Sequence, residues 1–244
     1  MEEFDENELK QLIDAALSSQ SDTRLSSNYL GLAETDIFSL LYEKLSRRMI
    51  GSDLSAVFQD VRSEILSRKS FLSLKDLHTV TSNCRKCALG VTPELPKWNV
   101  SSPNVLIVVE SPSISSEGIS LMISTFKDAG FTSEDLCLTY VNRCPIRRKF
   151  EQNEIVNCAP YLHSEIQIMN PKLIVCLGSL PSSILFGAPL KIKDIRGQIQ
   201  WLGTWPILST YSPMYVIKSA GSSPDHFSTD IRNAYNFIQS SSRN

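Results

Sequence analysis

The sequence lacks the features that direct a chain into a membrane or a secretory pathway. No apolar run approaches the roughly 20 residues that a helix needs to cross a bilayer. The first residues, Met1 to Glu6, are acidic, which is not typical of a signal peptide. We therefore expect a cytoplasmic protein with no membrane partner, whose thiols stay reduced and do not form a disulfide framework.

A strong net charge is also missing, because 24 Lys and Arg residues nearly balance 26 Asp and Glu residues. The charge is unevenly distributed: residues 1–70 carry 8 basic and 13 acidic side chains, and residues 71–244 carry 16 basic and 13 acidic ones. The weakly basic C-terminal part permits nucleic-acid binding. The acidic N-terminal part is a poor candidate for a surface that faces DNA.

A chain of 244 residues is long enough for one substantial domain and an appendage. Residues 1–70 contain three segments with helical spacing of apolar residues, which predicts a helical N-terminal extension. We expect this extension to pack on the main domain or to bind a protein partner. Residues 71–244 form the predicted main domain.

The main domain alternates predicted strands with predicted helices. The strands are expected at residues 104–109, 136–141, 172–178 and 205–210, and the helices near 119–129, 153–169, 180–186 and 228–238. This order predicts an α/β fold of three layers, α/β/α, around a central four-stranded parallel sheet. Ligands of such sheets bind at the carboxyl ends of the strands. At or just beyond these carboxyl ends lie Glu110, Tyr140, Gly178 and Ser212.

Four of the six cysteines form a pattern that is typical of an inorganic centre. Cys84 and Cys87 form a CxxC motif, and Cys144 and Cys158 follow after a long gap. A CxxC alone could be a redox dithiol or half of a zinc site. Four thiolates fit a structural zinc or an iron–sulfur cluster, and the number of ligands does not separate the two. Cys137 and Cys176 lie in apolar runs and are predicted to be core residues.

The order of these elements and cysteines resembles the uracil-DNA glycosylase superfamily, and within it the iron–sulfur family 4 enzymes. The resemblance covers about residues 74–238. Its most specific motifs are Glu154 to Cys158 with Pro160 to Leu162, then Asn170 to Gly178, Arg196-Gly197, and Thr210 to Tyr215.

The resemblance implies a uracil-DNA glycosylase-like domain over residues 71–244 and DNA as a partner. It also implies that Cys84, Cys87, Cys144 and Cys158 bind a [4Fe–4S] cluster, with a structural zinc as the alternative. The implied role of the cluster is to hold DNA-binding loops near the active site.

Several active-site positions differ from those of the family. The first motif keeps Glu110 and Pro112, but Ser111 and Ser113 stand in its altered loop, and Glu117 is a candidate for its acidic pair. The asparagine that reads uracil falls on Tyr140, with Asn142 two residues away, and the histidine of the H-P motif is Ser212. A tyrosine cannot supply the paired donor and acceptor of an amide. We therefore take Glu110, Glu117 and Ser212 as catalytic candidates. The base-binding candidates are Ser111, Pro112, Tyr140 and Asn142.

Basic residues near the third cysteine predict phosphate contacts. Two candidates, Met214 and Tyr215, occupy the place where the family inserts a loop into the duplex. The other predicted DNA contacts are Arg85, Lys86, Arg143, Arg147, Arg148, Lys149, Arg196 and Lys218.

Three functions fit these observations. The first is a glycosylase for a damaged or bulky modified base, such as a modified cytosine in phage DNA, removed as an antiviral defence. The second is a DNA-binding or replication accessory protein that keeps the fold without catalysis. The third is a divergent uracil-DNA glycosylase.

Overall fold

The computed structural model describes residues 73–89, 93–95, 102–146, 148–187, 189–219, 221 and 223–241. They belong to one compact unit. The predicted helical extension, residues 1–70, and the predicted DNA contact Arg147 lie outside the described residues.

The described residues contain a five-stranded sheet with the order β2-β1-β3-β5-β4. The strands are β1 (Val105–Val109), β2 (Leu136–Tyr140), β3 (Leu173–Leu177), β4 (Ile199–Leu202) and β5 (Trp205–Thr210). The four predicted strands are confirmed, and they pair in parallel. β4 was not predicted; it adds to the edge of β5 as an antiparallel hairpin partner.

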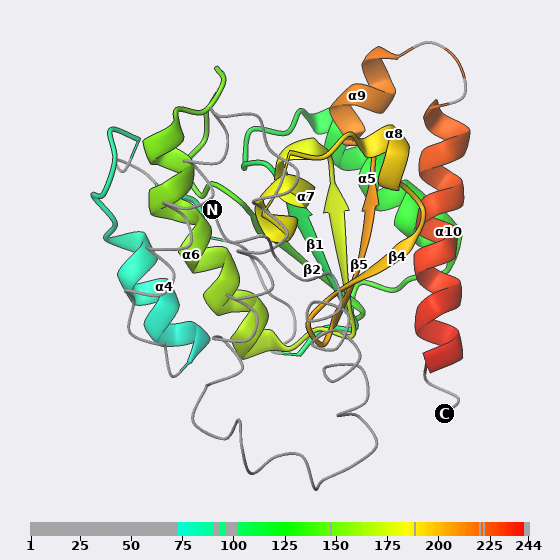
Figure 1. The fold of residues 1–244 in the computed structure, drawn as a ribbon, viewed down its shortest axis with the longest axis horizontal. Coiled ribbons are helices and arrows are strands. Elements are labelled where there is room, and N and C mark those ends of the chain that lie inside the picture. Colours follow the sequence, from blue (N-terminus) through cyan, green and yellow to red (C-terminus); the bar gives the residue numbers. More distant parts are fainter. Residues whose placement is uncertain are drawn as a thin grey trace, which may run out of the picture. The chain divides into compact units, whose positions relative to one another are not determined.

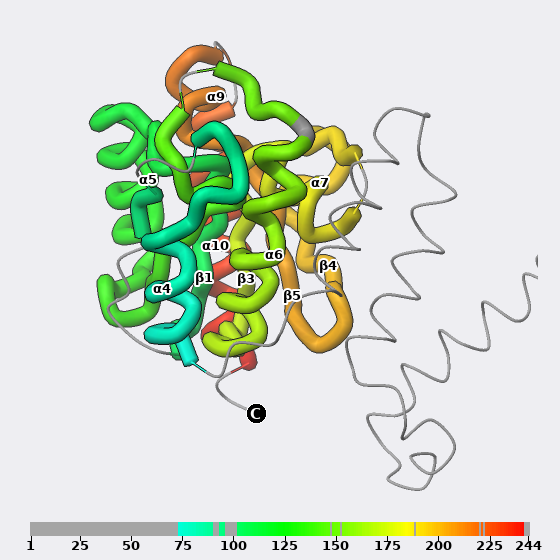
Figure 2. The backbone as a smooth tube through the Cα atoms, turned by 90° about the vertical axis from the view of Figure 1, so that its left-hand side faces the viewer, coloured from blue at the N-terminus to red at the C-terminus, as the bar shows by residue number. Residues whose placement is uncertain are grey.

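Helices cover both faces of the sheet, which confirms the three-layer prediction (Figure 1). The helices are α4 (Leu74–Ser82), α5 (Ser116–Ala129), α6 (Gln152–Met169), α7 (Ser179–Phe186), α8 (Ile192–Ile195), α9 (Pro213–Lys218) and α10 (Ser223–Ser241). α4 lies alongside α6 (Figure 2), and α5 packs against α9 and α10. None of the helices in the described part of the chain has both the length and the apolar character of a membrane span.

Alternate residues of the strands point to opposite faces, as the pleat of a sheet requires. On β1, Leu106 and Val108 join α6 and α7 in one hydrophobic core. Val105, Ile107 and Val109 of the same strand join α5 and α10 in a second core. Cys137 and Cys176 are buried in the first core, which confirms their prediction as core residues.

Local signals fix where the helices begin. Ser115 accepts a hydrogen bond from the backbone N–H of Gly118 (3.2 Å) and caps α5, and Gly130 ends this helix with a φ of 110°. Ser212 caps α9 by accepting from the N–H of Tyr215 (3.2 Å). α5 begins in the loop after β1, and α9 begins directly after β5. Both helices therefore start at the same edge of the sheet.

Candidate functional site

The ends of the parallel strands meet at one edge of the sheet, where the site was predicted. The backbone N–H of Asn142 donates to the carbonyl oxygen of Glu110 (3.0 Å), which continues the pairing of β1 with β2. The N–H of Gly178 donates to the carbonyl oxygen of Thr210 (2.9 Å), which continues the pairing of β3 with β5. A Cβ placed on Gly178 would lie 3.2 Å from the Cβ of Ser212. Ser212, which follows β5, therefore also lies against Gly178 at the end of β3.

The loop after β1 is held by its serines. Ser111 is buried, and its hydroxyl accepts from the N–H of Ser113 (3.3 Å). The hydroxyl of Ser113 accepts from the N–H of Ile146 (2.6 Å), which joins this loop to the segment after Cys144. Pro112, between the two serines, is half-buried. The loop thus has a defined shape without the glycines of the family motif.

An open pocket of about 460 Å³ lies at this edge of the sheet. We call it the strand-end pocket. Its volume falls in the range of about 300–1,000 Å³ that is usual for small-molecule sites. Its walls come from the loop after β1, the segment after Cys144 and the start of α9. The lining residues are Ser113, Ile114, Ser115, Pro145, Ile146 and Met214.

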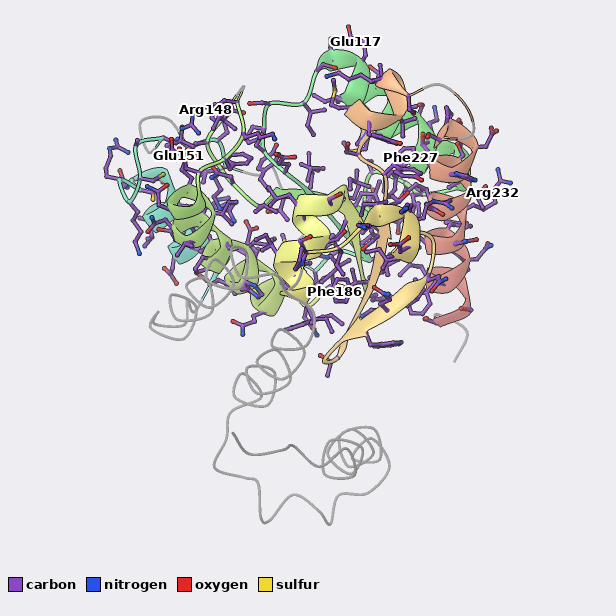
Figure 3. All side chains as sticks on the ribbon, turned by 45° about the horizontal axis from the view of Figure 1, so that its top comes forward. Glu117, Arg148, Glu151, Phe186, Phe227 and Arg232 are labelled. Carbon is purple, nitrogen blue, oxygen red and sulfur yellow. The ribbon has the colours of Figure 1, made fainter. Side chains whose placement is uncertain are left out.

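The two candidate carboxylates have different surroundings. Glu110 reaches solvent, but its position at the end of β1 is partly desolvated, and this burial raises the pKa of its carboxyl. Glu117 is exposed in the first turn of α5 (Figure 3). Hydrogen bonds from its own backbone N–H and from Ser115 lower its pKa. Glu117 thus stabilises the start of a helix. Neither carboxylate lines the strand-end pocket, and Glu110 is the stronger catalytic candidate because it is partly desolvated at the end of a strand.

Tyr140 and Asn142 differ sharply in what they can contact. Tyr140 is half-buried at the end of β2, and its pKa is raised by burial first and by the charge of Glu94 second. Asn142 is 1% exposed. Its amide donates to the carbonyl oxygen of Glu154 (3.3 Å) and accepts from the N–H of Cys144 (3.0 Å). The prediction that Asn142 contacts a base is corrected, because its amide is buried and already bonded.

The start of α9 combines a pocket wall with an exposed aromatic side chain. Met214 lines the strand-end pocket, and its sulfur accepts a hydrogen bond from the Ser115 hydroxyl (3.3 Å). Tyr215 is 51% exposed and stacks on Tyr211 with ring centroids 4.9 Å apart. Of the two wedge candidates, Tyr215 is therefore exposed and Met214 is half-buried at the pocket wall.

The four predicted metal ligands line one small cavity of about 20 Å³, together with Asn142, Arg143, Tyr161 and others. We call it the cysteine cavity. All four are free thiols. Among the described residues, no group of three or more His, Cys, Asp or Glu side chains is gathered closely enough to hold a single metal ion.

The thiols of the cysteine cavity are electrostatically coupled. Burial raises the pKa of Cys144 to about 12, and the charges of Cys158, Cys87 and Cys84 contribute in that order. Burial also raises the pKa of Cys158 to about 11, against the opposing effect of Arg143. Four thiolates so close together repel one another unless a positive centre binds them.

Several basic residues that were predicted to contact DNA lie at the surface. Arg85 and Lys86 of the CxxC segment, Lys149 and Lys218 are exposed. Arg148 is also half-exposed (46%), but its guanidinium binds the buried carboxylate of Glu154 in a fork, at 2.5 and 3.0 Å. Arg148 and Glu151 are neighbours before α6 (Figure 3). The surface charge of this segment therefore comes chiefly from Lys149.

Two predicted DNA contacts are corrected because their guanidinium groups are engaged inside the protein. Arg143 is only 2% exposed and pairs with Glu165 (2.8 Å). Arg196 donates to both carboxylate oxygens of Asp230 (2.6 and 3.0 Å) and to the carbonyl oxygen of His226 (2.9 Å). Arg143 is thus shielded from the surface, whereas Arg196 is 19% exposed and its guanidinium is committed to Asp230 and His226.

The ion pair of Arg196 with Asp230 also explains why a glycine, Gly197, follows Arg196. A Cβ at Gly197, whose φ is +72°, would lie 2.3 Å from an oxygen of Asp230. Burial raises the pKa of Asp230 in spite of Thr210 and Arg196, which oppose that rise. The Arg-Gly pair therefore builds a buried structural contact between the sheet and α10.

Of the six residues that line the strand-end pocket, only Met214 was among the candidates from the sequence. The five missed are Ser113, Ile114, Ser115, Pro145 and Ile146. A usable signal was their position, since each follows within a few residues of a predicted strand end. The sequence reasoning also missed Glu165, whose role depends on a contact with a distant arginine.

Comparisons with known proteins agree with this geometry. Residues 100–234, more than half of the chain, match the model of the Uracil DNA glycosylase superfamily. A type-4 uracil-DNA glycosylase of Thermotoga maritima is 29% identical over 124 residues, which cover 49% of this chain and 65% of that protein, just under two thirds of its length. Those of Archaeoglobus fulgidus and Pyrobaculum aerophilum are 24% and 26% identical, over 59% and 52% of this chain and 83% and 74% of their own lengths. The chain belongs to the uracil-DNA glycosylase superfamily.

Proposed function

We propose that this protein is a DNA glycosylase that flips a non-standard base out of DNA and hydrolyses its N-glycosidic bond. One observation carries the proposal. Glu110, with a raised pKa, stands at the same sheet edge as Tyr140 and Ser212, which replace the residues that read uracil in the family. The catalytic carboxylate is kept while the base-reading groups are changed.

Glu110 supplies the charge that the reaction needs. As the bond to the base breaks, positive charge develops on the sugar, and a carboxylate stabilises that charge or orients the attacking water. The partial desolvation of Glu110 strengthens its interaction with a developing cation. The negative charge on the departing base needs hydrogen-bond donors, and the hydroxyls of Tyr140 and Ser212 are the candidates.

The preferred substrate in this proposal is a bulky modified base. The strand-end pocket is open, about 460 Å³ in volume and edged by the hydroxyls of Ser113 and Ser115. Such hydroxyls suit a substituent that carries hydroxyl groups of its own, as in glucosylated hydroxymethylcytosine. Removal of such a base from phage DNA would serve an antiviral defence inside the cell.

The four cysteines are proposed to hold a [4Fe–4S] cluster, with a structural zinc as the alternative. Four free thiols line one cavity and are the donor set of either centre. Among the described residues they are not gathered closely enough for a single metal ion, which favours a cluster, whose four cysteines bind different iron atoms. When bound, the cluster supplies a rigid link between the CxxC segment and the segments around Cys144 and Cys158. Those segments carry Arg85, Lys86 and Lys149, which together with Lys218 are the proposed phosphate contacts. Tyr215 is the proposed wedge.

The proposed function is tested by incubating the protein with duplexes that contain uracil, hypoxanthine, hydroxymethylcytosine or glucosylated hydroxymethylcytosine. Abasic sites are then detected by alkaline strand cleavage, and the E110Q variant serves as the inactive control. We expect release of a modified base by the wild type alone. Cleavage at uracil only would overturn the altered specificity.

A second candidate, a DNA-binding protein without catalysis, is favoured by one observation. The hydroxyl of Ser212 accepts from the N–H of Tyr215 and caps α9, so this residue already has a structural role. If the wild-type protein binds the four duplexes but releases no base from any of them, this second candidate is established instead.

A further inference from the structure

A buried arginine with few partners lies beside the cysteine cavity. Arg143 is 2% exposed and is the largest fully buried side chain of the described residues. Transfer of a charged group out of water is strongly unfavourable unless other charges and hydrogen bonds compensate for it. The position of Arg143 therefore needs a physical reason.

The protein compensates this charge only in part. The Nη2 atom of Arg143 lies 2.8 Å from Oε2 of Glu165, a side chain that is itself fully buried. The same carboxylate oxygen accepts a hydrogen bond from the hydroxyl of Thr139 on β2. Within the described residues, neither the guanidinium nitrogens of Arg143 nor Oε1 of Glu165 have an aligned hydrogen-bond partner. One carboxylate thus meets a group with five donors.

The other side of Arg143 faces the cysteines. Arg143 lines the cysteine cavity together with all four of them. Its backbone N–H donates to the sulfur of Cys158 (3.3 Å). Its guanidinium carbon lies 6.0 Å from the ring centroid of Tyr161, whose hydroxyl donates to the sulfur of Cys84 (3.6 Å). The buried cation is therefore next to the place where a negative charge would arise on metal binding.

Formal charges indicate what Arg143 compensates. Four thiolates around a divalent centre carry a formal charge of about −2, whether that centre is zinc or a cluster. A nearby cation that is shielded from water stabilises such a charge strongly. Arg143 and Glu165 alone would be a neutral buried pair, but beside a tetrathiolate centre the arginine has two negative neighbours, one on each side.

We propose that Arg143 is an electrostatic positioning residue for the thiolate-bound centre, and that Glu165, which accepts a hydrogen bond from Thr139, balances the charge of Arg143 on its other side. The inference rests on the cofactor assigned under the proposed function. It assigns to Arg143 a role inside the protein in place of a contact with DNA. It also links the centre to β2, because Thr139 lies on that strand and directly precedes Tyr140 at the strand end.

The test compares R143Q, R143K, E165Q and the wild type, all purified with their centre in place. Two quantities are measured: the rate of metal loss to a chelator and, for an iron–sulfur centre, the midpoint potential in an anaerobic titration. R143Q should lose metal about tenfold faster, as is typical when a partner of the ligand shell is removed, and should be harder to reduce. E165Q should be easier to reduce, and R143K should stay close to the wild type.

The opposite signs of R143Q and E165Q separate this role from a merely structural one, since lost packing would not shift the two potentials in opposite directions. R232Q is the matched control, because Arg232 is an exposed arginine on α10 and should change neither quantity. If R143Q does not fold, E165Q and R143K decide the outcome. Equal potentials and metal-loss rates in E165Q and the wild type would overturn the proposal.

Failure of the proposal for Arg143 can be distinguished from failure of the proposed glycosylase function. Iron, sulfide and zinc are first determined in the wild type. A zinc centre removes the cluster from the proposed function, but the proposal is still tested by metal loss, which R143Q should speed up and E165Q should slow down. A wild-type protein that binds neither metal overturns the inference, whereas the base-release assay tests catalysis independently.

Discussion

The cysteine cavity and the strand-end pocket differ in how completely the protein encloses them. The cysteine cavity is small, and its walls include the buried Asn142 and Arg143 and a main-chain N–H that donates to Cys158. The strand-end pocket is much larger and open, and hydroxyl and apolar side chains form its walls. The protein thus encloses the four cysteines with buried polar and charged groups, whereas the strand-end pocket is open to solvent.

The two regions are nevertheless joined. The N–H of Ile146, two residues after Cys144, donates to the hydroxyl of Ser113 in the loop after β1. Asn142 bonds to the N–H of Cys144 on one side and to the start of α6 on the other. Loss of the centre should therefore disturb the pocket, whereas changes in the pocket should leave the centre intact.

The largest effect is expected from C144S, which removes a ligand from the cysteine cavity. The centre should be lost, and the melting temperature should fall by roughly 10 °C or more, since each kcal/mol corresponds to about 2–4 °C at this size. Metal analysis and thermal denaturation measure both. C137A is the control, because Cys137 is buried in the core away from the cavity and should keep its metal. Full metal content in C144S would contradict the assignment.

The next effect is on catalysis. E110Q should reduce the rate of base release by about 10²–10⁴-fold without weakening DNA binding, because it removes a charge needed only in the transition state. Single-turnover assays measure the rate. E117Q, which changes an exposed carboxylate at a helix start, should keep nearly the wild-type rate. Equal losses in both variants would contradict the distinct role of Glu110.

The raised pKa of Glu110 predicts that the rate of base release depends on pH. Burial raises the pKa of Glu110 above its ordinary value of 4.5, so the active, ionised form is lost as the pH falls through that raised pKa. The rate should therefore decline on the acid side at a pH above 4.5. Because the charged form is disfavoured in the folded state, E110Q should also unfold less easily at neutral pH. An acid limb at or below pH 4.5 would exclude this account of Glu110.

A buried ion pair outside both regions should affect stability alone. R196Q leaves Asp230, which is 1% exposed, without its cation and should lower the free energy of unfolding by about 3 kcal/mol. DNA affinity should not change. Denaturant titration and a binding assay measure the two. R232Q is the control, since Arg232 is exposed on the same helix (Figure 3). Weaker DNA binding at unchanged stability would restore Arg196 as a phosphate contact.

The smallest effect concerns a surface lysine. K149Q should lower the slope of log affinity against log salt by about 1, because one phosphate contact is removed, and should not alter base preference. The salt dependence of binding measures it, with K127Q on the exposed end of α5 as the control. An unchanged slope would mean that the DNA does not pass the cysteine segment.

Much of the fold could be predicted from the sequence because the buried strands are short, continuous apolar runs. β4 escaped prediction because Ile199–Leu202 is only four residues long, half-exposed and dependent on its pairing with β5. α8 and α9 are too short for a periodic pattern.

The site was predicted less well, for a physical reason. The sequence marks strand ends, so Glu110, Tyr140 and Ser212 were found at the expected edge. It does not show whether a charged or amide side chain points inward. Arg143 is buried against Glu165 and Arg196 is partly buried against Asp230, and both partners lie far along the chain. Asn142 is turned inward by Cys144 and Glu154.

The central claim is that the pocket has been altered to accept a base other than uracil. It is tested most directly by single-turnover release of uracil and of glucosylated hydroxymethylcytosine from matched duplexes, in the wild type and in Y140N. The account predicts that the wild type favours the modified base and that Y140N shifts the ratio towards uracil by about tenfold, as an amide is restored. A wild type that releases uracil faster, with Y140N slower on uracil, would contradict it.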